Sequence, residues 1–132
     1  MIRKLLPVIA VAATLAATSA QAGPGLSPEQ QLQEELRGRV AGEPVNCINL
    51  RNVRSSRVIN RTAIVFDAGG TLYVNRPRSG ASSLNKWDTQ VVRPFGSRLC
   101  EIDTMQMVHP TTGHFSGTVF LGEFVPYRRV RD

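Results

Sequence analysis

Four arginines stand within eleven residues of this chain, and arginine is the side chain best suited to holding an anion. They are Arg51, Arg54, Arg57 and Arg61. Because the planar guanidinium group matches the geometry of carboxylate and phosphate, the run predicts a basic strip that binds an acidic polymer or a phosphate group. On one continuous strand, Arg51, Arg57 and Arg61 share one face and Arg54 lies on the other. The alternative is a solvated sheet face whose arginine stems cover apolar surface.

Tyr73, Asn75 and Arg76 extend this candidate binding site. Tyr73 and Asn75 are two residues apart, so both lie on the same side of a strand, where a ligand would meet them with Arg57 or Arg76 nearby. Such a pair is also typical of a half-exposed cross-strand contact. Nucleic acid is not an expected partner, because no aromatic residue that could stack on bases stands between Cys47 and Phe66.

The two histidines of the chain, His109 and His114, are candidates for acid–base or metal chemistry. Either one with Asp103 would suit a small hydrolase, and two imidazoles with a carboxylate would suit zinc. Their spacing is not one that a helix or strand directs at a single point, so we expect two loop histidines and no metal. No serine lies in a G-x-S-x-G motif, and no glycine motif precedes a helix that would bind phosphate. The sequence therefore leaves open whether the chain is an enzyme, and it predicts no catalytic residue and no cofactor.

The first 22 residues have the pattern of a secretory signal peptide. Arg3 and Lys4 precede an apolar run, and Ala20-Gln21-Ala22 is a typical cleavage site. The apolar run is about half the length that a membrane span needs, so we expect cleavage after Ala22 and no span in the mature chain. Removal of Arg3 and Lys4 leaves 14 basic and 10 acidic residues, a mild net charge of +4.

The mature chain contains two cysteines, Cys47 and Cys100. In an exported protein an even number of cysteines predicts a disulfide. In the loop-entropy model a bridge between these positions contributes about 4 kcal/mol to stability. The alternative, a pair of reactive thiols, usually has its cysteines much closer in sequence.

Two kinds of element must position these side chains, and the first is a short helix near the start of the mature chain. We expect residues 23–42 to form a linker and this helix. Ser27 is the expected N-cap, Pro28 the first helical residue, and Gln30 the partner of Ser27 in a capping box. The helix should end near Gly38 or Gly42, and Glu35 is spaced to pair with Arg39.

From residue 43 onward the hydrophobic period changes to two, and residues 43–132 are predicted to form a single β domain. A turn at Asp67-Ala68-Gly69-Gly70 is the clearest hairpin signal. The expected strands are 45–50, 57–60, 62–66, 71–75, 89–92, 104–108 and 118–125. The fold class is therefore all-β, a small antiparallel barrel or sandwich with one short N-terminal helix. The length rules out a second domain and a Rossmann or TIM-barrel platform.

Four short patterns are spread over residues 43–127. They read Cys47-Ile48-x-Leu50-x-x-Val53-x-x-x-x-Val58-Ile59, Gly69-Gly70-x-x-Tyr73-x-Asn75-Arg76, Leu99-Cys100 and Leu121-Gly122-x-Phe124-x-Pro126. Together they resemble a domain-of-unknown-function family of small exported proteins from proteobacteria. The resemblance implies a periplasmic or secreted location in a Gram-negative cell, and it transfers no catalytic residue.

These observations favour a binding or accessory module of the cell envelope over an enzyme. Its expected partner is an envelope protein or an anionic glycan. Two alternatives stay open: a small envelope hydrolase that uses His109 or His114 with Asp103, and a purely electrostatic binder of anionic envelope polymers.

Overall fold

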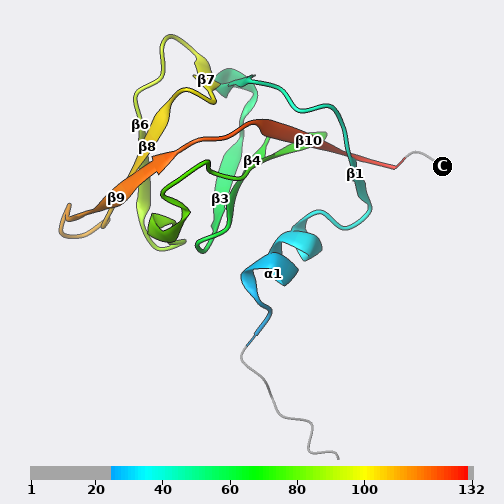
Figure 1. Cartoon of the computed structure of the whole chain (residues 1–132). Coiled ribbons are helices and arrows are strands. Elements are labelled where there is room, and N and C mark those ends of the chain that lie inside the picture. The colour runs from blue at the N-terminus through cyan, green and yellow to red at the C-terminus, as the bar shows by residue number, and fades with distance from the viewer. Residues whose placement is uncertain (1–24, 131–132) are drawn as a thin grey trace, which may run out of the picture.

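The computed structural model describes residues 25–130, and the predicted signal peptide lies outside them. Within this range the chain forms antiparallel sheets and one α-helix, α1 (Pro28–Glu35), as Figure 1 shows. The strands are β1 (Arg39–Ala41), β2 (Cys47–Asn49), β3 (Ser55–Ile59), β4 (Ala63–Asp67), β5 (Thr71–Asn75), β6 (Thr89–Val92), β7 (Arg98–Cys100), β8 (Thr104–Val108), β9 (Phe115–Phe120) and β10 (Phe124–Arg129). Two short 3-10 helices are η1 (Leu50–Asn52) and η2 (Ala81–Ser83).

The largest sheet has the strand order β1-β10-β5-β4-β3, and each pair in it is antiparallel. Strand β4, which lies between β5 and β3 in this sheet, begins with four consecutive buried residues, Ala63 to Phe66. Successive side chains of a strand point to opposite faces, so this burial shows that both faces of the sheet are covered. The fold is all-β and sandwich-like, and its described strands do not close into a barrel.

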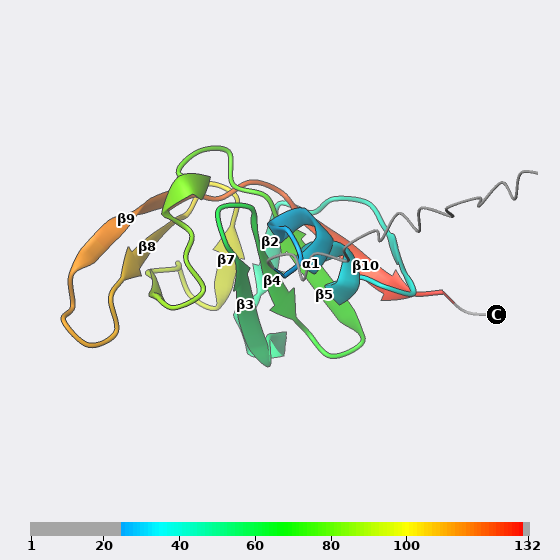
Figure 2. The same cartoon turned by 90° about the horizontal axis from the view of Figure 1, so that it is seen from below.

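Two smaller sheets, β2-β7 and β6-β8-β9, lie over one face of the large sheet. Between them is the larger hydrophobic core, which includes Ile64 and Phe66 of the large sheet and Met105, Met107 and Val119 of the small ones. The ring of Phe66 meets that of Phe124 edge to face at 5.7 Å between centroids. In Figure 2 the β8–β9 hairpin extends from one side of the molecule, away from α1.

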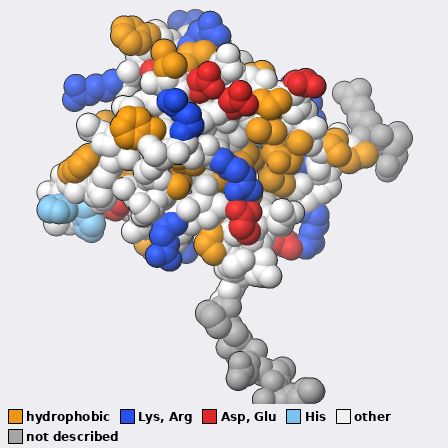
Figure 3. Space-filling view, in the orientation of Figure 1, with side chains coloured by type: hydrophobic (Ala, Val, Ile, Leu, Met, Phe, Trp, Pro, Cys, Tyr) orange, Lys and Arg blue, Asp and Glu red, His pale blue; other side chains and the backbone are white. Residues whose placement is uncertain are grey.

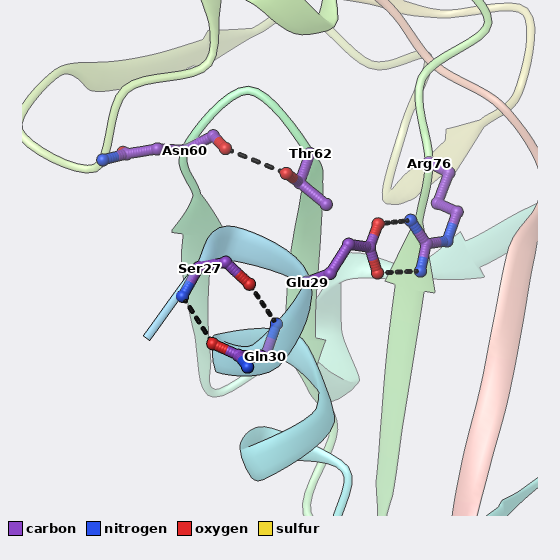
Figure 4. Close-up of polar contacts among 6 residues, drawn as sticks. All are labelled: Ser27, Glu29, Gln30, Asn60, Thr62 and Arg76. Carbon is purple, nitrogen blue, oxygen red and sulfur yellow. Dashed lines mark hydrogen bonds and ion pairs between the residues drawn. The ribbon is translucent and has the colours of Figure 1, made fainter. Parts of the chain in front are cut away.

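Helix α1 covers the opposite face of the large sheet. Leu32 is 1% exposed and packs with Val65, Leu72 and Val74 in a second core. The predicted capping box is confirmed: Gln30 N–H donates to Ser27 Oγ at 3.3 Å, and Ser27 N–H donates to Gln30 Oε1 at 2.9 Å (Figure 4). The helix therefore begins where its cap predicts and packs on the sheet.

The predicted disulfide is present. Cys47 and Cys100 stand directly opposite each other on β2 and β7, with 4.0 Å between their Cα atoms, and their sulfur atoms are bonded. The bond joins an early strand to one 53 residues later. A disulfide of this kind is typical of proteins that fold outside the reducing cytoplasm.

Several local expectations differ from the structure. Strand β7 is absent from the predicted set, as is β1, which lies inside the segment 23–42 expected to be linker and helix. The single strand expected over 118–125 is wrong, because it divides into β9 and β10 around residues 121–123. Glu35 does not pair with Arg39. It forms an ion pair with Arg57, while Arg39 donates to the carbonyl oxygens of Gly70 and Tyr127.

In the part of the chain that the structure describes, no helix is long and apolar enough to cross a membrane. Every buried side-chain nitrogen or oxygen in this part has a hydrogen-bond partner. No buried polar side chain of residues 25–130 is thus left free to bind a ligand, and candidate binding groups lie at the surface.

Candidate functional site

A polar hollow of about 410 Å³ lies where the β2–β3 connection passes the β4–β5 hairpin. We call it the Arg51–Arg54 hollow, and it is lined by Asn49, Arg51, Asn52, Arg54, Ala68, Thr71 and Tyr73. Three of the seven predicted binding residues meet here: Arg51, Arg54 and Tyr73. The sequence analysis missed four lining residues, although Asn52 directly follows Arg51 and Asn49 is two residues before it.

One wall of the hollow is formed by η1, which interrupts the chain between β2 and β3. Asn49 ends β2 and caps η1, because its Oδ1 accepts a hydrogen bond of 3.0 Å from Arg51 N–H. Asparagine is favoured at such positions because its side chain binds the backbone two residues later. The turn of η1 brings Arg51 and Asn52 to the same hollow.

The opposite wall is the predicted β4–β5 hairpin. Ala68 N–H donates to Thr71 O at 2.9 Å, and Asp67 Oδ1 accepts from Gly69 N–H at 2.9 Å. Gly69 has a φ of 82°, which favours glycine. Arg54 N–H donates to Asp67 O at 2.7 Å, so Arg54 is fixed against this hairpin just before β3 begins.

The chemistry of the lining favours a negatively charged ligand. No carboxylate lines the hollow, whereas two guanidinium groups, two amides and two hydroxyl groups do. The ion pairs among residues 25–130 involve Arg37, Arg57 and Arg76, so neither Arg51 nor Arg54 is neutralised by a carboxylate there. Both side chains are exposed. They can therefore hold an anion without first breaking an internal ion pair.

Arg57 and Arg61 do not line this hollow, and Arg51, Arg57 and Arg61 do not stand on one continuous strand. Only Arg57 lies within a strand; Arg51 is in η1, and Arg61 is in the turn between β3 and β4. Arg57 points to the helix-covered face, where its guanidinium lies 2.6 Å from Glu35 Oε2. These three arginines would share a face only on one continuous strand, and here η1 and the β3–β4 turn interrupt the chain.

Asn75 and Arg76 have structural contacts instead of a place in the hollow. Asn75 is fully buried and hydrogen bonded to the backbone of Gly122, so it cannot meet a ligand at the surface. Arg76 holds Glu29 of α1 by two hydrogen bonds of 2.7 and 3.1 Å (Figure 4). This contact lowers the pKa of Glu29 and raises the pKa of Arg76.

The structure does not bring the histidines together with Asp103. His109 and His114 are exposed and adjacent at the end of the β8–β9 hairpin, the pale blue side chains in Figure 3, where His109 N–H donates to His114 O. Asp103 precedes β8, at the other end of that strand, and its Oδ2 accepts from Cys100 N–H at 2.7 Å. A strand rises about 3.3 Å per residue. The five residues of β8 therefore hold the Asp103 carboxylate too far from either histidine for a direct contact. Within residues 25–130 no group of three or more His, Cys, Asp or Glu could hold a metal ion.

No family model, curated protein or solved structure matches this chain.

Proposed function

We propose that this chain is an exported binding module of the cell envelope, periplasmic or secreted, that does not act as an enzyme. The Cys47–Cys100 disulfide supports a location outside the cytoplasm. The signal-peptide pattern of residues 1–22 supports export. Of the two functional alternatives, the hydrolase lacks the contact between Asp103 and a histidine that it requires.

The ligand of the module is an anionic group, a carboxylate or a phosphate, carried by an envelope glycan or protein. The observation that carries this proposal is that Arg51 and Arg54 line one hollow with no carboxylate among its lining residues. A third arginine, Arg128, does not line the hollow, but it stands directly across from Thr71 in the register of β10 and β5. Paired residues of neighbouring strands share a face, so Arg128 lies on the same face of the sheet as Thr71, which lines the hollow with Arg51 and Arg54.

The test compares two variants with the same change of net charge. Arg51→Gln with Arg54→Gln removes both guanidinium groups of the hollow. Arg93→Gln with Arg129→Gln removes two exposed arginines that do not line it. Binding of inorganic phosphate and of glucuronate is followed by backbone amide chemical shifts, at low salt and at high salt. The two probes separate a phosphate ligand from a carboxylate ligand.

We expect saturable shifts centred on Asn49, Asn52 and Thr71, weakened about tenfold or more by the first pair of substitutions, because charge-assisted hydrogen bonds are lost. The second pair should leave the affinity within about twofold, because neither Arg93 nor Arg129 lines the hollow and so neither can form a charge-assisted hydrogen bond to its ligand. Equal weakening in both variants, with all binding abolished by salt, would overturn the proposal in favour of a purely electrostatic binder.

A further inference from the structure

We propose that a second hollow, at the other end of β3, is a binding site for an uncharged saccharide. The hollow has a volume of about 520 Å³. We call it the Arg61 hollow, and it is lined by Asn60, Arg61, Ser82, Ser83, Leu84, Asn85, Asp88, His109 and Ser116. It does not depend on the proposed anion site, with which it shares no lining residue.

The walls of this hollow come from four separate segments that are tied together by hydrogen bonds. Arg61 N–H donates to Leu84 O at 3.0 Å, and Lys86 N–H donates to Asn60 Oδ1 at 2.7 Å. These bonds join the β3–β4 turn to the loop between η2 and β6. The turn itself is fixed by Thr62 Oγ1, which donates to Asn60 O at 3.0 Å (Figure 4).

The far wall is held just as closely. On β9, a Cβ atom at Gly117 would collide with the Oγ atom of Ser83, and one at Gly80 would collide with Thr118 O. The segment that contains η2 therefore lies in close contact with β9, and only glycine permits this approach. A hollow bounded by segments in fixed contact is already formed before a ligand arrives, which reduces the entropy lost on binding.

Arg61 has a left-handed backbone conformation, with a φ of 55°. Among residues 25–130 it is the only residue other than glycine with a positive φ. This conformation is costly for a side chain that carries a Cβ atom. Non-glycine residues held in such regions cluster at ligand sites. The conformation places an arginine at the rim of the hollow where glycine would be the unstrained choice.

The chemical groups in the hollow fit a ligand rich in hydroxyl groups. An anion is disfavoured by the carboxylate of Asp88, and a cation is disfavoured by the guanidinium of Arg61. A hydroxyl group both donates and accepts, so it can pair with the amides of Asn60 and Asn85, with serine hydroxyls and with either charged group. The ion pairs within residues 25–130 include neither Arg61 nor Asp88, which leaves both free for such contacts.

Trp87 does not line the hollow, but its neighbours in sequence do, and it supplies an exposed aromatic ring next to them. It stands between Asn85 and Asp88 of the hollow, and its side chain is 73% exposed. Asn85 Oδ1 accepts from Trp87 N–H at 2.9 Å and fixes the backbone there. An exposed tryptophan offers a flat apolar surface with a polar edge, and the C–H face of a sugar ring packs on such a surface. Lys86 Nζ lies 4.9 Å from the centre of the ring.

The hollow contains serine, histidine and aspartate, yet its geometry favours binding over hydrolysis. His109 Nδ1 accepts hydrogen bonds of 3.3 Å from the N–H groups of Thr111 and Thr112. The neutral imidazole therefore carries its proton on Nε2. A serine hydrolase needs the opposite tautomer, with the proton on Nδ1 and a free Nε2 to take the serine proton.

The test uses the fluorescence of Trp87, which is the single tryptophan of the sequence. The protein is titrated with uncharged trisaccharides of glucose, galactose and N-acetylglucosamine, at low salt and again at high salt. Arg61→Gly removes the guanidinium at a position where glycine is unstrained, so this variant should fold. Asp88→Ala removes the carboxylate, and Arg51→Gln with Arg54→Gln serves as the control.

We expect a saturable change in fluorescence with at least one trisaccharide, weakened about tenfold or more in Arg61→Gly and in Asp88→Ala because hydrogen bonds to charged groups are lost. The change should persist at high salt and in the Arg51 and Arg54 control. Absence of saturation with every trisaccharide at millimolar concentration would overturn the proposal. So would an affinity that Arg61→Gly leaves unchanged. The control separates this result from the anion site, because loss of phosphate binding alone leaves the saccharide titration intact.

Discussion

Asn75 and Gly122 exchange two hydrogen bonds in the interior of the protein, although they are 47 residues apart. Asn75 Nδ2 donates to Gly122 O at 2.7 Å, and Gly122 N–H donates to Asn75 Oδ1 at 2.9 Å. The side chain of Asn75 thus takes the place of a neighbouring strand for the buried backbone between β9 and β10. A Cβ atom at Gly122 would collide with Arg76 O, so glycine is required for this approach.

Asn75→Ala should lower the free energy of unfolding by about 2–4 kcal/mol. The substitution leaves the N–H and C=O groups of Gly122 buried without partners, and unpaired buried polar groups are costly. Urea denaturation measures the effect, with Asn46→Ala as the control because Asn46 is exposed. An Asn75→Ala variant as stable as the control would contradict the assigned role.

Loss of the disulfide should be about as costly. The variant in which Cys47 and Cys100 are both replaced by alanine is expected to lose about 4 kcal/mol, because its unfolded chain is no longer restricted by a loop of this length. Denaturation is measured with and without reductant. The reductant should destabilise the wild type and leave the double variant unchanged. A wild type that is indifferent to complete reduction of the bond would contradict this prediction.

Features that depend on neighbouring residues were predictable from the sequence. The Ser27 cap fixes the start of α1, and the turn after Asp67 fixes the β4–β5 hairpin. Strands β6 and β8 have the predicted bounds, since each is a run rich in β-branched or long apolar residues between turn residues. In each of these cases the stabilising contact lies within a few residues of the signal.

Features that depend on distant residues could not be predicted from the sequence. Strands β1 and β7 have three residues each and exist because β10 and β2 pair with them. The grouping of residues in the Arg51–Arg54 hollow also depends on distant contacts. Arg51 and Tyr73 line the same hollow because η1 turns the chain toward the β4–β5 hairpin. The alternation of side chains along a strand does not predict that turn. Asn75 was predicted to face a ligand, but its side chain is hydrogen bonded to the backbone of Gly122, 47 residues later in the chain.

The ion pair between Glu29 and Arg76 should make the attachment of α1 depend on pH. The hydrogen bond from Arg76 is the main cause of the lowered pKa of Glu29, partly opposed by desolvation. A carboxyl group whose pKa is lower in the folded state binds fewer protons there than in the unfolded state. The stabilisation that Glu29 contributes is therefore complete above its pKa in the unfolded chain, and it is lost as the pH falls through its pKa in the folded protein. Arg76 stays cationic throughout, because its pKa is raised.

We expect Glu29→Gln to reduce stability near neutral pH by at most about 1 kcal/mol, since the pair is exposed. The difference from the wild type should shrink as the pH falls through the acidic range in which Glu29 titrates. The control is Glu34→Gln, whose partner Arg37 lies just beyond the same helix, so that this pair does not tie α1 to the sheet. Denaturation curves at several acidic pH values measure both variants. A constant difference between wild type and Glu29→Gln at every pH would contradict the prediction.

Arg61→Gly should stabilise the protein, by up to about 1 kcal/mol. Glycine adopts the φ of 55° without strain, although it also gives the unfolded chain more freedom, and that partly offsets the gain. Arg57→Gly is the matched control, because it removes the same side chain from the middle of β3, together with the ion pair to Glu35. Glycine is unfavourable within a strand, so this control should be destabilised. The two substitutions are thus expected to shift the urea midpoint in opposite directions. If Arg61→Gly were as destabilising as Arg57→Gly, the arginine side chain would be needed by the fold itself. If instead the strain at residue 61 is retained because it serves ligand binding, Arg61→Gly should raise the free energy of unfolding and lose saccharide binding.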